Sequence, residues 1–338
     1  MNPEATGPAA FHPKTPGELV SLVVMAWKQE ALLPKVIAAA FAQTYQPLDI
    51  VLSDDASPVG SFAVMQVMAA AYRGPHLIRV NQNAENLGLI GHVNRVFELA
   101  SGVLVVYNAG DDLSEPDRVA RLYAAFAKDR PGLVHSNVTD VDATGQPLPR
   151  QRERMRHAEL DGKSLADLAT TKNNCIGASC AWNPKLFQVF GPIVETDLFE
   201  DRVMYFRARL LGEVAYVDDR LLRYRRGTGL SFDRGDGDAR SRRNFQIDLA
   251  TLRQRRRDCL CVAPDARKVL AALNRKIAKR EAQLAEIPDP TGPDISDHAK
   301  SADRPNRVQR AERRAEKLDR RKTPTKVRSK ESDGSASS

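Results

Sequence analysis

The sequence predicts an α/β fold with a mainly parallel central sheet, followed by a helical extension and a basic tail. Short runs rich in Val, Ile and Leu alternate with amphipathic segments through roughly the first two thirds of the chain. The turns between them are short, as is typical of parallel strands connected by helices. Right-handed crossovers place the carboxyl ends of such strands at one edge of the sheet, where open α/β folds bind ligands.

The predicted elements follow one another in a regular order. The expected strands of the first half are 19–26, 48–52, 76–80, 103–107 and 132–138, and the helices between them are 31–43, 62–72, 90–100 and 116–128. In the second half we expect a strand at 175–182, helices at 183–191 and 197–211, and two short strands at 214–217 and 221–224. This pattern favours helices on both faces of one sheet.

Paired acids follow two of the predicted strands. Asp111 and Asp112 come after the run Val103–Tyr107, and Asp54 and Asp55 come after the second strand. Two adjacent carboxylates at a strand end suit a hard divalent cation, which in turn suggests a phosphate ligand. A turn with two solvated aspartates is the alternative, but two such pairs at one sheet edge favour a binding site.

The segment after Asp112 predicts a new helix. Ser114 is expected to cap that helix, and Pro116 suits its first turn.

Bulk properties are those of an ordinary cytoplasmic protein. Of the 338 residues, 42% are hydrophobic and 28% charged, and the net charge is +8. No apolar run reaches the roughly 20 residues that a membrane helix needs, and residues 1–17 lack the features of a signal peptide. The four cysteines lack zinc-site spacing, so free thiols in a reducing compartment are expected.

Composition divides the chain into four parts. We expect a flexible N-terminus at 1–18, an α/β domain at 19–232, a helical extension at 233–287 and a basic, disordered tail at 288–338. Within the extension, the apolar spacing at 270–287 predicts an amphipathic helix that packs on the body or pairs with another chain. The charges of the tail suit a solvated segment or loose attachment to an anionic membrane surface. Nucleic acid is disfavoured as a partner, since no aromatic platform accompanies the charge.

Six motifs in this order resemble the inverting glycosyltransferase family 2, over roughly 19–231. They are Gln43-Thr44-Tyr45, Ser53-Asp54-Asp55-Ala56-Ser57, Asn86-Leu87-Gly88 through Asn94, Gly110-Asp111-Asp112 with Pro116, Glu200-Asp201, and Leu222-Arg223-Tyr224-Arg225. The resemblance implies a Rossmann-like nucleotide-diphospho-sugar transferase fold and a nucleotide-sugar donor. The QxxRW motif of processive synthases is absent from the sequence, so the similarity is to non-processive members.

The resemblance also implies a role for each matching residue. Asp201 would be the general base, and Asp111 and Asp112 would hold Mg²⁺ or Mn²⁺ on the diphosphate. Donor contacts would come from Asp54, Asp55, Asn86, Gly88, His92, Asn94 and Asp111. Glu200, Arg225 and Arg226 would contact the acceptor or a phosphate.

For Glu200 and Asp201 the alternative is a pair of acids that stabilise a helix dipole. For His92 the alternative is an ordinary surface histidine.

Two departures from the family pattern weaken these assignments. The first aspartate of the metal motif is replaced by Ala109, and the histidine that often follows the last motif is absent at Arg226-Gly227.

Three functions remain open on the sequence. The leading one is transfer of a sugar to a hydroxyl of a glycan or lipid-linked saccharide, in polysaccharide biosynthesis for the cell envelope. A degenerate protein that only binds nucleotide-sugar or a partner is the second. A sugar-phosphate nucleotidyltransferase ranks below both, because it should carry a Gly-rich loop after the first strand, and Met25–Glu30 contains no glycine.

Overall fold

The computed structural model describes residues 17–58, 60–151, 160, 162–172, 175–212, 214–227 and 237–287, without the side chains of 237 and 238. All of them fall in the first of two compact units, which ends at Pro288. Most of the flexible N-terminus expected at 1–18 and the basic tail expected at 288–338 lie outside the described residues. The Gly- and Asp-rich run 234–238 predicts a flexible link; 234–236 lie outside the described residues, whereas 237 and 238 begin α9. Most of the segment 149–160, expected as a loop or exposed helix, also lies outside the described residues.

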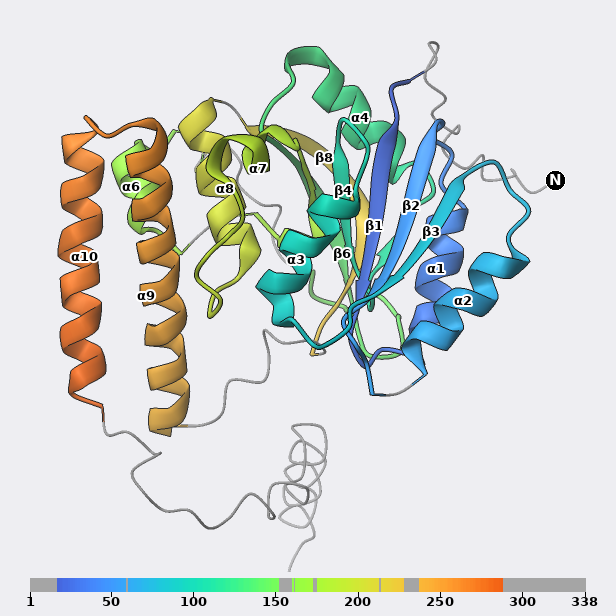
Figure 1. Ribbon diagram of the computed structural model, residues 1–338, viewed down its shortest axis with the longest axis horizontal. Coiled ribbons are helices and arrows are strands. Elements are labelled where there is room, and N and C mark those ends of the chain that lie inside the picture. The colour runs from blue at the N-terminus through green and yellow to red at the C-terminus, as the bar shows by residue number, and fades with distance from the viewer. Residues whose placement is uncertain are drawn as a thin grey trace, which may run out of the picture. The chain divides into compact units, whose positions relative to one another are not determined.

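A single mixed sheet, in the order β3-β2-β1-β4-β7-β6-β8-β5, forms the centre of the described unit (Figure 1). Its strands are β1 (Val20–Ala26), β2 (Leu48–Asp54), β3 (Leu77–Gln82), β4 (Val105–Ala109), β5 (Leu113–Ser114), β6 (Leu133–Val141), β7 (Cys180–Trp182) and β8 (Val214–Arg225). Strands β1 to β4 are parallel, as are β6 and β8. Strand β7 runs antiparallel to β4 and β6, and β5 antiparallel to β8. The prediction of a mainly parallel α/β sheet is confirmed.

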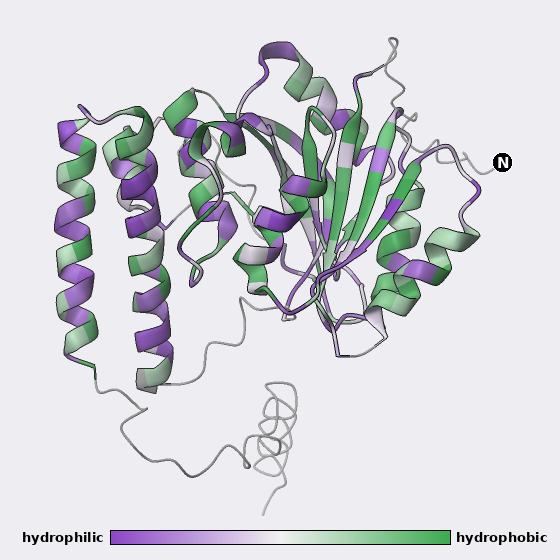
Figure 2. Ribbon diagram, viewed as in Figure 1, coloured by the Kyte–Doolittle hydropathy of each residue, from purple (hydrophilic) through white to green (hydrophobic). Residues whose placement is uncertain are grey.

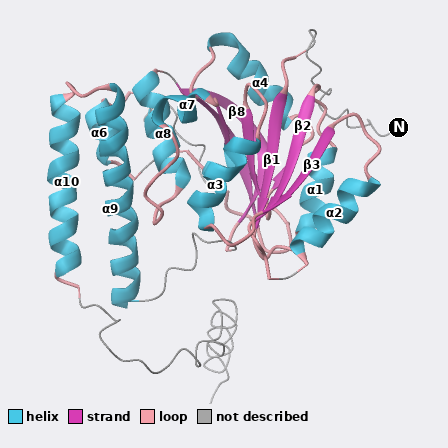
Figure 3. Cartoon of the chain, viewed as in Figure 1, coloured by secondary structure: helices cyan, strands magenta, loops and turns pink. Residues whose placement is uncertain are grey.

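Helices cover both faces of this sheet (Figure 3). The described helices are α1 (Leu33–Phe41), α2 (Ser61–Ala71), α3 (Gly88–Leu99), α4 (Arg118–Asp129), α6 (Leu165–Thr170), α7 (Lys185–Phe190), α8 (Glu200–Leu211), α9 (Gly237–Val262) and α10 (Arg267–Ala285). Of these, α9 and α10 pack mainly on other helices. One apolar cluster joins the sheet to α1, α2 and α4, and a second joins it to α3, α7 and α8. Strands β1 and β2 are buried along their whole length between the two clusters, which explains their near-continuous apolar sequence (Figure 2).

The structure corrects the predicted helix start at Ser114. Leu113 and Ser114 form the short strand β5 against β8, and helix α4 begins only at Arg118. The Ser114 hydroxyl donates to Asn108 Oδ1 at 2.7 Å instead of capping a helix. Turn-forming residues after a strand therefore lead here into a further strand pairing before the helix begins.

Two other elements differ from the expectation. The predicted strand 175–182 is a 3₁₀ turn at Gly177–Ser179 followed by the three-residue β7. The two short strands predicted at 214–217 and 221–224 are one strand, β8, whose register against β6 shifts around Asn137. A shift in strand pairing interrupts the alternation of apolar and polar residues, so one continuous strand looks like two short ones in the sequence.

The C-terminal helices pack on the body. Helix α10 contacts both α9 and α6, with Val269 and Leu273 buried. This is the first of the two arrangements expected for the amphipathic segment 270–287. Helix α9 is longer than the expected basic helix at 241–257 and contacts α8. The helical extension belongs to the same compact unit as the sheet, while its exact boundary at 233–287 stays a prediction.

Candidate active site

Both acid pairs lie at the same edge of the sheet. Asp54 ends β2 and is opposite Ala26 of β1, while the preceding residue of β1, Met25, is opposite Ala109 at the end of β4. Asp111 and Asp112 follow Ala109 directly. With one strand between them, the two acid pairs stand about 10 Å apart, on the standard spacing of neighbouring strands. They therefore form two parts of one edge rather than a single carboxylate cluster.

Arg225 holds the loop that carries Asp111 and Asp112. Its backbone N–H donates to Asp112 Oδ1 at 2.8 Å, and its Nε donates to the carbonyl of Asp111 at 3.0 Å. The same guanidinium reaches the carbonyls of Asp142 and Ala143 in the turn after β6. Arg225 was expected to contact acceptor or phosphate; the structure gives its guanidinium backbone partners instead.

Asp112 is almost fully buried, with 1% of its surface exposed. Burial, and then the neighbouring Asp111 carboxylate, raise the pKa of Asp112 well above its ordinary value. A cation bound here would stabilise the ionised form of this buried carboxyl group and reduce its repulsion with Asp111.

A buried arginine that the sequence analysis did not single out lies beneath this loop. The guanidinium of Arg118 donates to Asn108 Oδ1 and Ser114 Oγ, each at 2.9 Å, and to the carbonyls of Tyr107 and Ala178. Burial lowers the pKa of Arg118 to about 10. Arg118 therefore ties the end of β4 to the 3₁₀ turn at Gly177–Ser179.

Asp54 and Asp55 organise the loops that follow β2 and β3. Asp54 accepts hydrogen bonds from the backbone and hydroxyl of Ser57 and from the amide of Gln82. Asp55 Oδ1 accepts from Asn83 Nδ2 at 2.8 Å and from the backbone N–H of Leu87 at 2.9 Å. Both carboxylates are buried, so they fix the shape of the edge around them.

The next predicted donor contacts lie beside Asp55. Asn86 Nδ2 donates to the carbonyl of Asp55, and Asn86 Oδ1 accepts from the N–H of Gly88. Gly88 has φ +69°, a left-handed conformation that favours glycine, and it begins helix α3. Asp55, Asn86 and Gly88 therefore come together at the start of α3, while their contact with a donor stays a prediction.

His92 is buried, not exposed, so the alternative of a surface histidine is wrong. Its Nε2 lies 2.7 Å from Ser53 Oγ, and 3% of its surface is exposed. Burial lowers its pKa to about 4, although Asp55 and Asp54 oppose that shift. His92 is neutral near pH 7 and supports the end of β2.

Asn94 stands apart from the other donor candidates. Its side-chain amide donates to the carbonyl of Ile193 and accepts from the N–H of the same residue, each at 2.9 Å. The structure therefore places this side chain on the segment that leads to α8, and not against Asp55.

Glu200 and Asp201 are the first two residues of α8, which is the position that the helix-dipole alternative requires. Glu200 is also buried, and burial, together with Asp201, raises its pKa to about 8. A Cβ atom on Gly177 would come within 2.5 Å of Glu200 Oε1 and 3.1 Å of Asp201 Cβ. The 3₁₀ turn therefore packs directly on this acid pair, and a side chain at position 177 would displace the Glu200 carboxyl group.

Tyr107 connects the predicted metal ligands to the predicted base. Burial raises the pKa of its phenol, and the carboxylates of Glu200, Asp111, Asp112 and Asp201 add to that rise in this order. Because Coulomb interactions weaken with distance, all four acids lie within electrostatic range of one phenol. Sequence alone placed these residues on separate elements; the fold brings them together.

Arg226 points in a different direction from Arg225. Its Nη1 lies 3.9 Å from Asp140 Oδ1, and its side chain is 44% exposed. It is the more accessible of the two arginines predicted to contact acceptor or phosphate.

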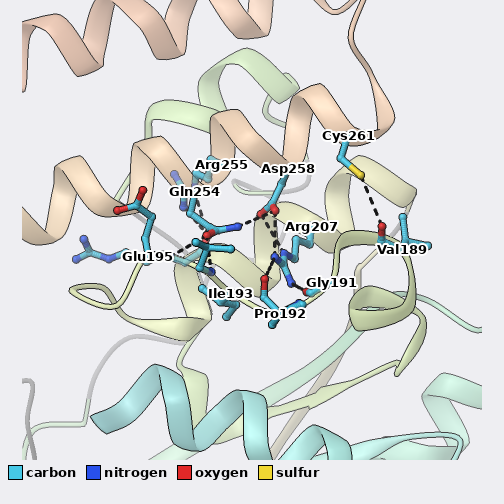
Figure 4. Close-up of polar contacts among 12 residues, drawn as sticks. Val189, Gly191, Pro192, Ile193, Glu195, Arg207, Gln254, Arg255, Asp258 and Cys261 are labelled. Atoms are coloured by element: carbon cyan, nitrogen blue, oxygen red, sulfur yellow. Dashed lines mark hydrogen bonds and ion pairs between the residues drawn. The ribbon is translucent and has the colours of Figure 1, made fainter. Parts of the chain in front are cut away.

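Helix α9 clamps the segment that leads to α8 (Figure 4). Gln254 Oε1 accepts from the N–H groups of Val194 and Glu195, and its Nε2 donates to Asp258 Oδ1 at 2.9 Å. Asp258 in turn accepts two hydrogen bonds from Arg207 of α8, each at 3.0 Å.

Arg207 completes this clamp by donating to the carbonyl of Gly191 at 2.9 Å. The sequence analysis missed the residues of the clamp, since buried polar pairs between distant helices leave no local pattern.

The residues present fit a divalent cation in part. Asp111 and Asp112 are hard oxygen ligands, and the raised pKa values of Asp112 and Glu200 show an acidic region that a cation would relieve. Ala109 leaves this loop one carboxylate short of the family motif. Among the described residues, no group of three or more His, Cys, Asp or Glu side chains is arranged to hold a metal. A diphosphate would therefore have to supply the remaining ligands.

Comparison with known proteins gives a consistent family. Residues 21–187 match the family model described as glycosyl transferase family 2. The putative glycosyltransferase EpsE of Bacillus subtilis is 31% identical over 114 residues, which is 34% of this chain and 40% of that protein. An uncharacterized glycosyltransferase of a Nostoc species, alr2836, is 24% identical over 217 residues, 61% of this chain and 64% of that protein. The chain thus spans less than two thirds of either relative.

Solved structures confirm the fold. The mannosyltransferase PcManGT from Pyrobaculum calidifontis, in complex with GDP-Man and Mn²⁺, has a TM-score of 0.55 and 17% identity, over 93% of this chain and 84% of that one. Residues 1–349 of S. aureus TarS, in complex with UDP-GlcNAc, give a TM-score of 0.52 at 13% identity, over 78% of this chain and 71% of that one. Residues 21–187, about half of the chain, are therefore similar to glycosyl transferase family 2.

Proposed function

We propose that this chain is an inverting glycosyltransferase that moves a sugar from a nucleotide-sugar to a hydroxyl of a glycan or lipid-linked saccharide. The observation that carries the proposal is a chain of contacts between the two acid pairs. Gly177 packs on Glu200 and Asp201, and Arg118 ties the neighbouring Ala178 to the end of β4, which leads to Asp111 and Asp112. These contacts bring the candidate base, on α8, next to the candidate diphosphate site, at the end of β4. The family match and the two complexes with nucleotide-sugars support this assignment.

The donor would lie along the edge formed by β2, β1 and β4. The hydrogen bonds of Asp55 within the protein use Oδ1, which leaves Oδ2 to accept from the base or ribose of a nucleotide. Asp54, Asn86 and Gly88 would shape that end of the site through the loop contacts described above. Neutral His92 would support it from below through Ser53.

The diphosphate end of the donor would lie over Asp111 and Asp112. These two carboxylates would hold Mg²⁺ or Mn²⁺, which supplies charge neutralisation for the departing nucleotide diphosphate. Arg225 and Arg118 fix the loop from both sides, so the carboxylates are oriented before the donor arrives.

Asp201 would take the proton from the acceptor hydroxyl as that oxygen attacks the anomeric carbon. The bond from that carbon to the nucleotide diphosphate breaks on the opposite side, so the configuration is inverted. Glu200, with a pKa near 8, carries a proton at neutral pH and leaves Asp201 as the better base of the pair. Arg226 is the exposed cation nearest to the end of β8 and suits a contact with a phosphate or acceptor.

The proposal includes a cytoplasmic location and a peripheral attachment of the basic tail to the inner face of the membrane. The tail lies outside the described residues. No described helix is long and apolar enough to cross a bilayer.

A screen of nucleotide-sugars by thermal shift, with and without Mn²⁺, tests the proposal. We expect one donor to raise the melting temperature only with metal, and to do so no longer in Asp111→Asn or Asp112→Asn. Hydrolysis of that donor then identifies a catalyst. Metal-dependent binding without hydrolysis or transfer to any acceptor would point to the non-catalytic alternative that the missing aspartate at Ala109 favours. Binding of no donor by the folded protein would contradict both.

A further inference from the structure

A small, partly open pocket lined by several charged residues lies among the helices on the α8 side of the described unit. Its lining comes from residues at the end of α6 and just after it, from Arg202 of α8, from α9 and from Lys276 of α10, and water-sized access to it is about 20 Å³. The same helices appear side by side in Figure 1 and contact one another directly. None of the proposed donor or metal ligands lines this pocket.

Cations outnumber acids in this pocket. Lys172, Arg202, Arg255 and Lys276 line it, whereas Asp248 is its only lining carboxylate. Asp248 is 6% exposed and forms ion pairs with Lys172 at 2.6 Å, Arg202 at 3.2 Å and Arg280 at 3.2 Å. A single carboxylate is therefore paired with three cations, and two of them, Arg202 and Arg280, are themselves largely buried.

Arg255 adds a further positive charge without a carboxylate of its own. Its guanidinium donates to the carbonyls of Arg202, Leu168, Ala169 and Thr171. Burial, followed by repulsion from Arg202, lowers the pKa of Arg255 to about 10. The carboxylates of Asp201, Asp248 and Asp258 oppose that shift without cancelling it. Incompletely compensated buried charge is costly, so an anion would stabilise this cluster.

Lys276 is the side chain best placed to receive such an anion. It is partly buried, lines the pocket, and makes no hydrogen bond or ion pair with any other described residue. An ammonium group without a partner, next to a cluster with excess positive charge, is a donor that a ligand can use.

We propose that this pocket binds a phosphate-class oxyanion, held by Lys276 together with Lys172 and Arg202. A multivalent oxyanion suits the site better than a single carboxylate, because Asp248 already pairs with three cations and two further cations, Arg255 and Lys276, line the pocket. Two sources share this chemistry: free inorganic phosphate, and a phosphate carried by a larger molecule. Because Arg202 follows Asp201 on α8, the second source would bring a phosphorylated acceptor to the base helix.

Lys276→Gln tests the site without breaking a contact of the fold. The full chain is titrated with sodium phosphate against sodium chloride of equal ionic strength, and binding is followed by calorimetry and thermal shift. We expect millimolar or tighter binding to the wild type and about tenfold weaker binding to Lys276→Gln, as for one charged hydrogen bond. Lys279→Gln, an exposed lysine on the same helix that does not line the pocket, is the matched control and should bind as the wild type does.

Equal binding by the wild type and Lys276→Gln, or none by the wild type, would overturn the proposal. Asp112→Asn distinguishes this pocket from the donor site. If phosphate binding is lost in Asp112→Asn but kept in Lys276→Gln, the phosphate binds at the donor site, and the proposal is overturned. Nucleotide-sugar binding is measured on the same proteins, so a failure of the proposed function is seen independently. Phenyl phosphate then distinguishes the two sources of phosphate. If it binds as tightly as inorganic phosphate, the pocket accepts a phosphate that is attached to a larger molecule. If it does not bind, the ligand is the free ion.

Discussion

Arg225 and Asp112 lie 113 positions apart in the chain, and the backbone N–H of the first donates to the carboxylate of the second at 2.8 Å. The contact joins the end of β8 to the acidic loop after β4. The Arg225 side chain strengthens it by holding the carbonyls of Asp111, Asp142 and Ala143. The proposed metal ligands are therefore positioned by a strand that the chain forms long after them.

Arg225→Ala should loosen the acidic loop while leaving the backbone contact to Asp112 in place. We expect metal-dependent donor affinity to fall about tenfold or more, as is usual when the support of a metal ligand is removed. Calorimetry with donor and Mn²⁺ measures the change. Arg223→Ala is the control, since that arginine lies on the same strand and its exposed side chain pairs with Glu115 instead of holding the acidic loop. An equal loss in both variants would show that charge, rather than loop support, matters.

Asp201→Asn should remove the proton acceptor and keep the donor site intact. We expect kcat to fall by about 10²–10⁴ with donor affinity little changed. Glu200→Gln should keep more activity, because burial already keeps Glu200 protonated near pH 7. Steady-state kinetics of sugar transfer compare the two. Activity in Asp201→Asn close to that of the wild type would assign the base elsewhere.

Gln254→Ala should free the backbone of the segment before α8. Its Oε1 satisfies the N–H groups of Val194 and Glu195, so its loss leaves two donors unpaired, at a cost of about 1–3 kcal/mol each if they stay dry. We expect kcat to fall more than the donor KM rises, because α8 carries the base but not the donor ligands. Arg253→Ala, an exposed neighbour paired with Glu281, is the control. A change in stability with unaltered kcat would limit Gln254 to a structural role.

The pair of Arg207 and Asp258 should matter for stability. Both side chains are almost fully buried, at 0% and 1% exposure, so removing one leaves an uncompensated charge in the core. Asp258→Ala should destabilise the protein by about 3–5 kcal/mol, measured by urea unfolding. The double variant Arg207→Met/Asp258→Leu should recover part of that loss. If Asp258→Ala alone were neutral, the ion pair would contribute nothing net.

His92 should make stability depend on pH in mild acid. Its native pKa of about 4 lies below its ordinary value of 6.5, so the unfolded chain binds this proton more readily. The contribution is intact above pH 6.5 and is lost as the pH falls toward 4, at about 1.4 kcal/mol per pH unit. In His92→Gln, the free energy of unfolding should therefore change less with pH between about 4 and 6.5 than it does in the wild type. An unchanged slope would mean that His92 does not titrate there.

The sheet edge and its acids were predictable because their determinants are local. Val103–Tyr107 is an apolar run that ends at Gly110, and the same logic applies to the strand before Asp54. The end of β4 therefore falls close to its predicted position, and Asp54 and Asp111 fall at one edge as expected.

The supports of the site were not predictable, because they join distant parts of the chain. Arg118 reads as an ordinary charged helix residue, yet it is fully buried and reaches the carbonyl of Ala178. Asn94 belongs to a motif associated with the donor, yet its amide holds Ile193, 99 positions later. Single-sequence reasoning detects periodicity and caps, whereas these contacts depend on which helix faces which loop.

The clamp between α9 and α8 limits where the chain can be truncated for expression. The family match ends at residue 187, before Asp201 and well before Gln254 and Asp258. A fragment cut at that limit would lose the proposed base, and one cut at 232 would keep it but remove the α9 residues that contact Phe206 and Arg207. We expect both fragments to aggregate on expression, whereas a fragment ending near 287 should remain folded.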